Sequence, residues 1–159
     1  MDIRYTNKDF QFFLRVSALI FNKDETKVLL FNVEGRDFYM LPGGKIEELE
    51  ESIDAIKREV KEELGWDNLE YSFLGVSEEF VSSKGYNNQQ LNLIYKGIYK
   101  DETTSDNFKG LEGEWINFKW VDLKDIDNYT IYPSIVKKMI KDSNKIHHSI
   151  DNLIRANNK

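Results

Sequence analysis

The feature that most constrains the fold is an amphipathic helical segment, SIDAIKREVKEEL at 52–64. Four apolar residues recur along it at steps of three and four: Ile53, Ile56, Val60 and Leu64. On a helix these side chains lie within roughly 60° of one another and form a single stripe. Gly65 follows at the position of a helix C-cap. One side of this helix must therefore pack on a core that the rest of the chain supplies.

Stretches rich in β-branched and aromatic residues predict strands on both sides of the helix. These stretches lie at 12–21, 27–34, 71–83, 91–100 and 114–123. A turn cluster after the first stretch makes 12–34 a predicted hairpin, and the composition of 101–114 predicts a surface loop. Strands and helices do not alternate regularly, so the pattern favours a mixed β-sheet flanked by helices over a doubly wound parallel sheet.

The end of the chain is predicted to be helical over about 133–155. Pro133 stands near the first turn of this segment, and the tail beyond Asn144 carries a modest apolar stripe. The chain has 159 residues and no linker rich in Pro, Gly or Ser. We therefore expect residues 1–159 to form a single domain.

The composition argues against several classes of function. The sequence has no cysteine, which excludes disulfides, thiolate metal sites and cysteine nucleophiles. A formal net charge of −6 argues against extended contact with nucleic acid, but it allows small phosphorylated ligands if metal ions and local cations intervene. No apolar run approaches the roughly 18 residues of a membrane helix, and the N-terminus lacks the shape of a signal peptide. We expect a cytoplasmic protein without membrane contact.

The polar flank of the 52–64 helix is strongly acidic. Glu59, Glu62 and Glu63 fall together, centred roughly 110° from the apolar stripe, where like charges repel. Clustered carboxylates are the usual ligands of hard cations such as Mg²⁺. The alternative is a solvated face of an amphipathic helix, but it does not explain the Gly43-Gly44 break, which permits a close backbone approach to the same place.

The segment resembles the signature of the Nudix hydrolase family. That signature runs Gly, five residues, Glu, seven residues, Arg-Glu, an aliphatic residue, any residue, Glu-Glu, any residue, Gly and an apolar residue. Its positions here are Gly44, Glu50, Arg58, Glu59, Val60, Glu62, Glu63, Gly65 and Trp66. Every charged and glycine position matches. Trp66 replaces the usual smaller aliphatic residue, and Leu49 replaces a glycine often found before the Glu50 position.

This resemblance implies an α+β fold of the α/β/α sandwich type, with a mixed β-sheet flanked by helices. It also implies a hydrolase that cleaves the pyrophosphate of a nucleoside diphosphate linked to another moiety. In such enzymes water attacks one phosphorus with the help of Mg²⁺ or Mn²⁺. Phosphoryl transfer depends on positioning and charge neutralisation more than on covalent catalysis, which agrees with a chain rich in carboxylates.

The resemblance further implies roles for individual residues. Glu59, Glu62 and Glu63, with the Gly44 carbonyl, are implied to hold the divalent ions. Arg58 is implied to pair with Glu50 or Glu59 and to hold its orientation. One glutamate accepts the proton of the attacking water, and family members differ in whether it belongs to the signature or to a later loop or strand.

Other residues are weaker candidates for the site. An extra base or metal ligand is sought among Glu50, Glu78 and Glu79. Residues that could contact the substrate phosphates are Arg15, Arg36 and Lys45. For each, an ordinary surface position is the alternative, and Arg15 is notable because an unpaired charge inside an apolar strand is costly to bury.

Two readings of the function stay open at this point. The first is a magnesium-dependent hydrolase of a nucleotide-type small molecule, and the alternative is a Nudix-fold regulatory module that binds a nucleotide without cleaving it. The complete set of glutamates favours the hydrolase. The sequence leaves open which nucleoside diphosphate derivative is cleaved. Many relatives are dimers, so a homodimer is compatible with the resemblance.

Overall fold

The structure is a computed structural model that describes residues 1–83, 85–103 and 105–153. Its strands are β1 (Arg4–Thr6), β2 (Phe10–Phe21), β3 (Lys27–Val33), β4 (Tyr39–Met40), β5 (Gly43–Lys45), β6 (Leu69–Ser83), β7 (Tyr86–Tyr99), β8 (Asn107–Gly110), β9 (Gly113–Asp122), β10 (Ile131–Tyr132) and β11 (His147–Asn152). Its helices are α1 (Ser52–Leu64), the 3₁₀ helix η1 (Leu123–Asn128) and α2 (Val136–Lys141). None of the described helices combines the length and apolar character needed to cross a membrane.

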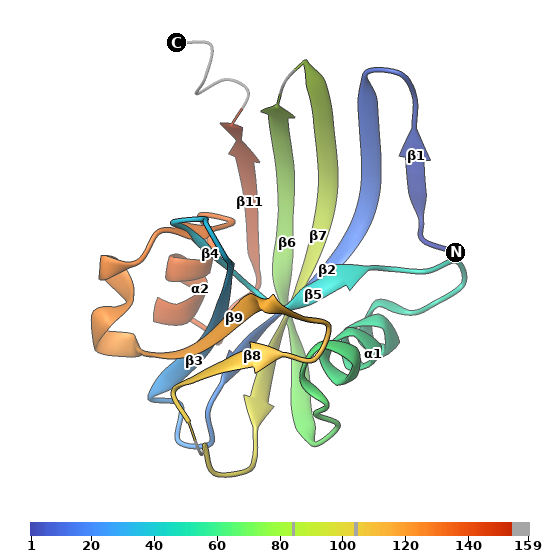
Figure 1. Cartoon of the computed structure of the whole chain (residues 1–159). Helices are drawn as coiled ribbons and strands as arrows, with labels where there is room; N and C mark the ends of the chain where they lie inside the picture. The colour runs from blue at the N-terminus through green and yellow to red at the C-terminus, as the bar shows by residue number, and fades with distance from the viewer. Residues whose placement is uncertain (84, 104, 154–159) are drawn as a thin grey trace.

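One mixed sheet forms the centre of the molecule (Figure 1), as the sequence predicts. Its main path runs β10-β4-β3-β2-β7-β6-β11. β7 lies parallel to β2, from the pair Phe10–Asn87 to the pair Phe21–Ile98, whereas β6 and β7 form an antiparallel hairpin. The predicted hairpin at 12–34 is also present, because β2 and β3 pair antiparallel at Ile20–Leu29.

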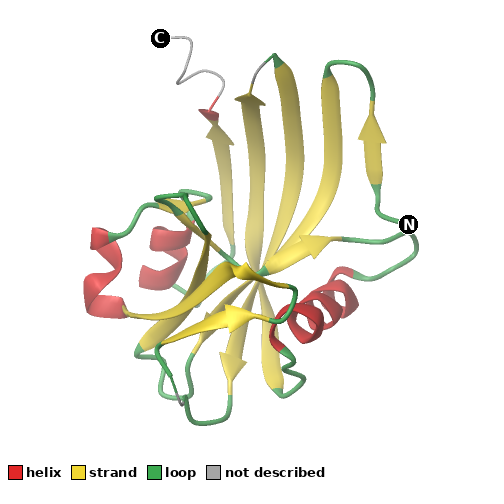
Figure 2. Cartoon of the chain, viewed as in Figure 1, coloured by secondary structure: helices red, strands yellow, loops and turns green. Residues whose placement is uncertain are grey.

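The helices pack on opposite sides of this sheet (Figure 2), which gives the expected α/β/α arrangement. Alternate residues of β2 serve the two cores, since neighbouring strand residues point to opposite faces. Val16 and Ala18 pack with Val60 of α1 in one buried cluster. Leu19 packs with Met139 of α2 in the other.

Helix α1 spans the predicted residues. Its buried positions are Ala55, Ile56, Val60 and Leu64, so the apolar stripe faces the core. The helix ends at Gly65, which has a φ of 75° and donates its N–H to the Lys61 carbonyl. A left-handed residue with this bond is a common helix C-cap and favours glycine. Packing of its apolar face and termination at Gly65 therefore fix the orientation of α1 and of its acidic flank.

The predicted helical segment over about 133–155 is wrong for most of its described length. Only Val136–Lys141 is α-helical, and β11 pairs parallel to β6 at the sheet edge. The strand satisfies backbone groups that β6 would otherwise leave open. Ile146 and Ile150 are 64% and 63% exposed, so the apparent stripe is not packed on a core. Residues 154–155 lie outside the described residues.

The predicted surface loop at 101–114 needs a similar correction. It contains strand β8, which pairs antiparallel with β9. The short strands β1, β4, β5 and β10 span only two or three residues each. Segments of that length have no measurable periodicity. β1, β5 and β4 pair with the longer strands β2 and β3, and β10 in turn pairs with β4.

Candidate active site

Two glycines bring the β5 backbone against helix α1. β5 pairs with β2, placing Gly44 beside Val16 and Gly43 beside Ser17. A Cβ atom added to Gly44 would overlap the carboxyl group of Glu59, and one added to Gly43 would overlap the Val16 carbonyl oxygen. The Gly43-Gly44 pair therefore lets the Glu59 carboxylate lie directly over the strand backbone.

We expect Gly44→Ala to lower kcat by about 100-fold, because displacing a catalytic group by roughly 1 Å can cost that much. The added methyl group must push the Glu59 carboxylate from its place. Steady-state kinetics would measure the loss. Ser72→Ala is the control, because Ser72 is an exposed residue of β6. Unchanged kcat in Gly44→Ala would show that the position of Glu59 is not critical.

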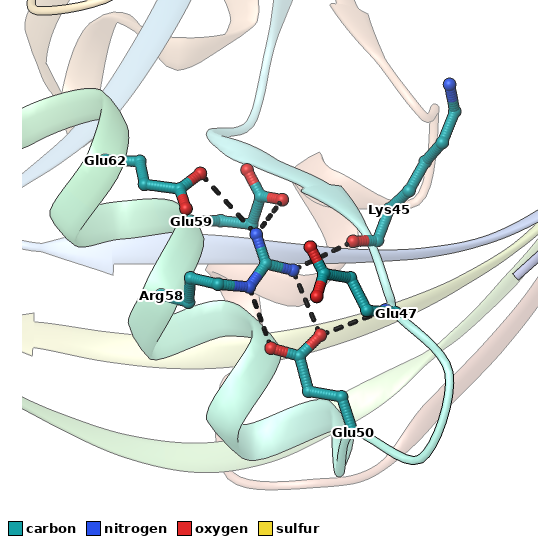
Figure 3. A network of polar contacts seen from close by, with 6 residues as sticks. All are labelled: Lys45, Glu47, Glu50, Arg58, Glu59 and Glu62. Carbon is teal, nitrogen blue, oxygen red and sulfur yellow. Dashed lines mark hydrogen bonds and ion pairs between the residues drawn. The ribbon is translucent and has the colours of Figure 1, made fainter. Parts of the chain in front are cut away.

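Arg58 connects the helix to the preceding loop (Figure 3). Its Nε and Nη2 atoms donate to the two oxygens of Glu50 at 2.8 and 3.0 Å. Nη1 donates to Glu59 Oε1 at 2.8 Å, and Nη2 also donates to the Lys45 carbonyl at 3.1 Å. Nη1 lies farther from Glu62 Oε2, at 3.5 Å. The predicted pairing of Arg58 is confirmed, and it involves Glu50 and Glu59 at once.

Glu50 is held as an anion by these contacts. Hydrogen bonds from Arg58 lower the pKa of the Glu50 carboxyl, helped by the Glu47 backbone N–H, which donates to Glu50 Oε2 at 3.0 Å. The side chain of Glu50 is 16% exposed. Both oxygens of Glu50 accept hydrogen bonds, so Glu50 is placed to orient Arg58. Among the weaker candidates it is thus poorly placed to act as base or metal ligand.

Glu59 and Glu63 lie where burial disfavours their charged forms. Burial raises the pKa of the Glu63 carboxyl to about 8, the charges of Glu59 and Glu112 add to this, and Arg15 opposes it. Burial also raises the pKa of Glu59, against the hydrogen bond from Arg58. The Oε2 atom of Glu63 is buried and has no hydrogen-bond partner among the described residues. Such an atom is costly in isolation and points to a partner of opposite charge.

Glu112 is a further candidate for the site that the sequence reasoning missed. It follows strand β8, in the turn where the Leu111 backbone N–H donates to the Glu63 carbonyl at 2.9 Å. Its charge acts on both Glu59 and Glu63. The available signal was the stretch GLEG at 110–113, in which two glycines flank an acidic residue at a turn. The composition of the surrounding loop concealed it.

Arg15 lines a pocket together with Glu79 of β6. Its charge acts on Glu63 and also on Glu79 of β6. Glu78 points to the opposite face of the sheet, since neighbouring strand residues alternate, and its Oε2 lies 2.7 Å from His148 Nε2. Of the two adjacent acids, only Glu79 therefore lies on the Arg15 side.

The other cationic candidates are more peripheral. The Nζ atom of Lys45 lies 5.1 Å from the centre of the Phe13 ring, and its backbone carbonyl accepts from Arg58. The guanidinium of Arg36 lies 5.6 Å from the centre of the Phe38 ring on an exposed turn. Both make cation–π contacts, which leave their charges available at the surface.

The carboxylates suit an ion that takes few protein ligands. Within the part of the chain that the structure describes, no three acidic or histidine side chains form a preassembled metal cage. Mg²⁺ commonly binds through one or two carboxylates and completes its octahedron with water and substrate phosphates. The buried, unpartnered oxygen of Glu63 and the raised pKa values of Glu59 and Glu63 fit such an ion.

The family assignment follows from a comparison over most of the chain. The sequence profile of the NUDIX domain matches residues 11–142. The chain belongs to the Nudix hydrolase family. The matched region contains the whole Gly44–Trp66 signature, with Arg58, Glu59 and Glu63 in the arrangement described above.

Solved structures show the same fold. The mutator MutT protein from Bacillus halodurans superposes with a TM-score of 0.60 at 15% identity, covering 86% of this chain and 89% of that one. The dihydroneopterin triphosphate pyrophosphohydrolase of E. coli has a TM-score of 0.63 at 20% identity, covering 80% and 92%.

A sequence relative is found in Saccharomyces cerevisiae (strain ATCC 204508 / S288c). Its m7GpppN-mRNA hydrolase is 31% identical over 121 residues, which is 76% of this Nudix chain. The matched part is 12% of that protein's length. The likeness is therefore confined to one region of the larger protein.

Proposed function

We propose that this Nudix hydrolase uses Mg²⁺, or Mn²⁺, to cleave the pyrophosphate of a nucleoside diphosphate linked to another moiety. The observation that carries the proposal is the half-buried Glu63. Its Oε2 lacks a hydrogen-bond partner in the part of the chain that the structure describes, and the charges of Glu59 and Glu112 act on the same carboxyl. This arrangement is unfavourable without a cation. A purely regulatory module would have no need to keep all of these carboxylates.

The residues that would hold the cation are Glu59, Glu62 and Glu63, with the Gly44 carbonyl. When bound, a divalent cation neutralises phosphate charge and lowers the pKa of a coordinated water. Arg58 keeps the Glu59 carboxylate over Gly44 through its 2.8 Å bond. Arg15, whose charge opposes the rise in the pKa of Glu63, would supply a positive charge for the substrate phosphates.

The reaction exchanges one phosphorus–oxygen bond for another. The water oxygen bonds to one phosphorus of the diphosphate, and the bond from that phosphorus to the bridging oxygen breaks. The water proton passes to a carboxylate, for which Glu62, Glu63 and Glu112 are the candidates. The products are a nucleoside monophosphate and the phosphorylated second moiety.

The substrate panel should include several classes of pyrophosphate. ADP-ribose, oxidised deoxynucleoside triphosphates, nucleotide sugars and dinucleotides fit the proposed chemistry. Similarity to the m7GpppN-mRNA hydrolase adds a methylated cap dinucleotide. The net charge of −6 disfavours extended RNA contact, so short cap analogues are the better probe. We place the protein in the cytoplasm as a single domain, and light scattering would test whether it forms a homodimer.

Product analysis in H₂¹⁸O tests the proposal. Each compound is incubated with protein and Mg²⁺, and mass spectrometry identifies the product that carries ¹⁸O and hence the phosphorus that was attacked. We expect one class to be cleaved and EDTA to abolish the reaction. Binding of a nucleotide without release of any product would instead support the regulatory module.

We expect Mg²⁺ to stabilise the protein more at pH 8.5 than at pH 6. The folded-state pKa of Glu63 is raised to about 8 from an ordinary value of 4.5, so without metal this carboxyl binds a proton on folding. Its contribution to stability is greatest below pH 4.5 and is lost as the pH rises toward 8. Protons compete with the cation for this group, so metal affinity rises over the same range.

Thermal denaturation with and without Mg²⁺ at the two pH values measures this effect. Glu63→Gln removes the titrating group and should make the Mg²⁺-induced shift in Tm small at both pH values. A shift that is equal at both pH values in the unmodified protein would contradict the expectation.

A further inference from the structure

A polar network lies on one face of strands β2, β7 and β6, opposite to the face that helix α1 covers. The charge of Arg15, a member of this network, acts on Glu63 in the acidic flank of that helix. Arg15 Nε donates to Ser17 Oγ at 3.3 Å, and Ser17 Oγ donates to Asn92 Oδ1 at 2.9 Å. Gln90 Nε2 donates to Glu79 Oε1 at 2.8 Å. Ser17 and Asn92 are each 1% exposed. Burying polar groups in a sheet face is costly, so a network at this place indicates a built site.

Glu79 is incompletely satisfied within this network. Its Oε1 atom accepts a hydrogen bond from Gln90 Nε2 at 2.8 Å. Its Oε2 atom is buried and has no hydrogen-bond partner within residues 1–83, 85–103 and 105–153. Among the described residues, only two buried side-chain atoms lack a partner, and the other is Glu63 Oε2. The positive charge of Arg15 opposes the rise in pKa of both carboxyls, and Arg15 and Glu79 line the same pocket.

A pocket of about 220 Å³ adjoins this network. Arg15, Glu79 and Gln90 line its polar side. Its other side is largely apolar, formed by Met40, Leu41, Tyr132 and Pro133. The volume is below the roughly 300 to 1,000 Å³ of pockets for drug-sized ligands. The space therefore suits one flat ring system with polar edges better than a complete dinucleotide.

We propose that this pocket binds the base of the nucleotide, and that Glu79 recognises two adjacent N–H donors on its edge, as in a 2-amino-6-oxopurine such as guanine. The inference rests on the proposed function, because it places the base beside Arg15 and the diphosphate toward Glu63. It makes Glu79 a specificity-determining residue that does not take part in bond cleavage.

The hydrogen-bonding chemistry of Glu79 favours this edge over others. An ionised carboxylate has only acceptors, and Gln90 holds one of its oxygens in place. A ring N–H beside an exocyclic amino group presents two parallel donors, which match a carboxylate as a bidentate pair. Adenine presents a ring acceptor beside its amino group, and hypoxanthine lacks the 2-amino group. Each leaves an oxygen of the carboxylate unpaired.

Calorimetric binding of GDP, IDP and ADP in the presence of Mg²⁺ tests the proposal. We expect the unmodified protein to bind GDP at least about 10-fold more tightly than IDP or ADP, because sites built for an N–H discriminate strongly against analogues that lack it. Glu79→Gln replaces an acceptor by a donor of the same size, and the preference should fall to within about 3-fold.

Glu78→Gln is the matched control, since the neighbouring side chain lies on the opposite face beside His148. It should keep the preference for GDP. Circular dichroism reports whether Glu79→Gln folds. If it does not, Gln90→Ala removes the donor that holds Glu79 Oε1 and should also reduce the preference.

Two outcomes overturn the inference: equal affinity for the three nucleotides in the unmodified protein, or an unchanged preference in folded Glu79→Gln. An equal loss of turnover with every substrate and an unchanged preference would assign Glu79 to the reaction instead. A separate result bears on the proposed function. Selective GDP binding without cleavage of any pyrophosphate would contradict the proposed hydrolase function but support base recognition in the pocket. Cleavage without base preference would support the hydrolase function and contradict base recognition in the pocket.

Discussion

Glu63→Gln is expected to lower turnover of the best substrate by at least about 100-fold, the lower range for loss of a catalytic acid or base. The substitution keeps the shape of the side chain but removes the charge from a half-buried position among Glu59, Glu112 and Arg15. An amide is a poor ligand for Mg²⁺ and cannot accept the proton of water. The fold should be retained, because removing one of several repelling charges does not weaken the packing of α1.

Steady-state kinetics and thermal denaturation measure the two parts of this expectation. Glu70→Gln serves as the control, because Glu70 is 69% exposed and only pairs with Lys100. Glu62→Gln should also lose activity by orders of magnitude. Retention of wild-type activity by purified, folded Glu63→Gln would overturn the site assignment.

Glu112→Gln extends this comparison to the carboxylate outside the signature. If Glu112 accepts the proton, its replacement should lower kcat while leaving the Mg²⁺-induced shift in Tm largely unchanged. If it holds the cation, both quantities should fall. The comparison with Glu63→Gln therefore separates proton acceptance from metal binding.

Much of the fold was predictable because its signals are local. The apolar stripe and Gly65 define α1 from Ser52 to Leu64, and the turn residues after β2 define a hairpin. The signature also predicted that Arg58 would pair with Glu50 or Glu59, a contact within one short segment. In each case the relevant residues are close in sequence and follow a known local pattern.

The remaining features depend on partners far away in the chain. His147–Asn152 becomes a strand because β6 offers it an open edge, and no pattern within the tail indicates this pairing. Glu112 joins the site because a turn after β8 is bonded to the end of α1. The placement of Glu79 and Arg15 in one pocket depends on the register of β6 with β7 and on the parallel register of β7 with β2, which single-sequence patterns do not specify.

The contact network of Arg58 leads to the largest expected effect on stability. We expect Arg58→Met to lower the free energy of unfolding at pH 7 by about 2 to 4 kcal/mol, somewhat below the range for a fully buried pair. The side chains of Arg58, Glu50 and Glu59 are 26%, 16% and 12% exposed. Removing the guanidinium leaves two largely buried carboxylates without their main donor. Arg58→Lys should recover little, because an ammonium cannot make the two parallel bonds to Glu50.

Urea denaturation as a function of pH tests this prediction, because the loss of stability in Arg58→Met should depend on pH in a defined direction. Hydrogen bonds from Arg58 lower the folded-state pKa of Glu50 below its ordinary value of 4.5. The pair therefore stabilises the protein above pH 4.5, and this contribution is lost as the pH falls through the lower folded-state value. Arg58→Met should remove the dependence assigned to Glu50, so that the variant and the unmodified protein differ less at pH 3 than at pH 7.

A double-mutant cycle separates the loss of the pair from the loss of packing. Replacing Arg58 leaves the Glu50 carboxylate without a donor in a largely buried place, and Glu50→Leu removes that carboxylate. The double variant Arg58→Met/Glu50→Leu should therefore be more stable than the sum of the single changes predicts. Additive effects would show that the pair has no net coupling. Activity should stay low in the double variant even if stability returns, because Glu59 still lacks the 2.8 Å bond that holds it over Gly44. Stability and activity would then depend on different partners of the same guanidinium.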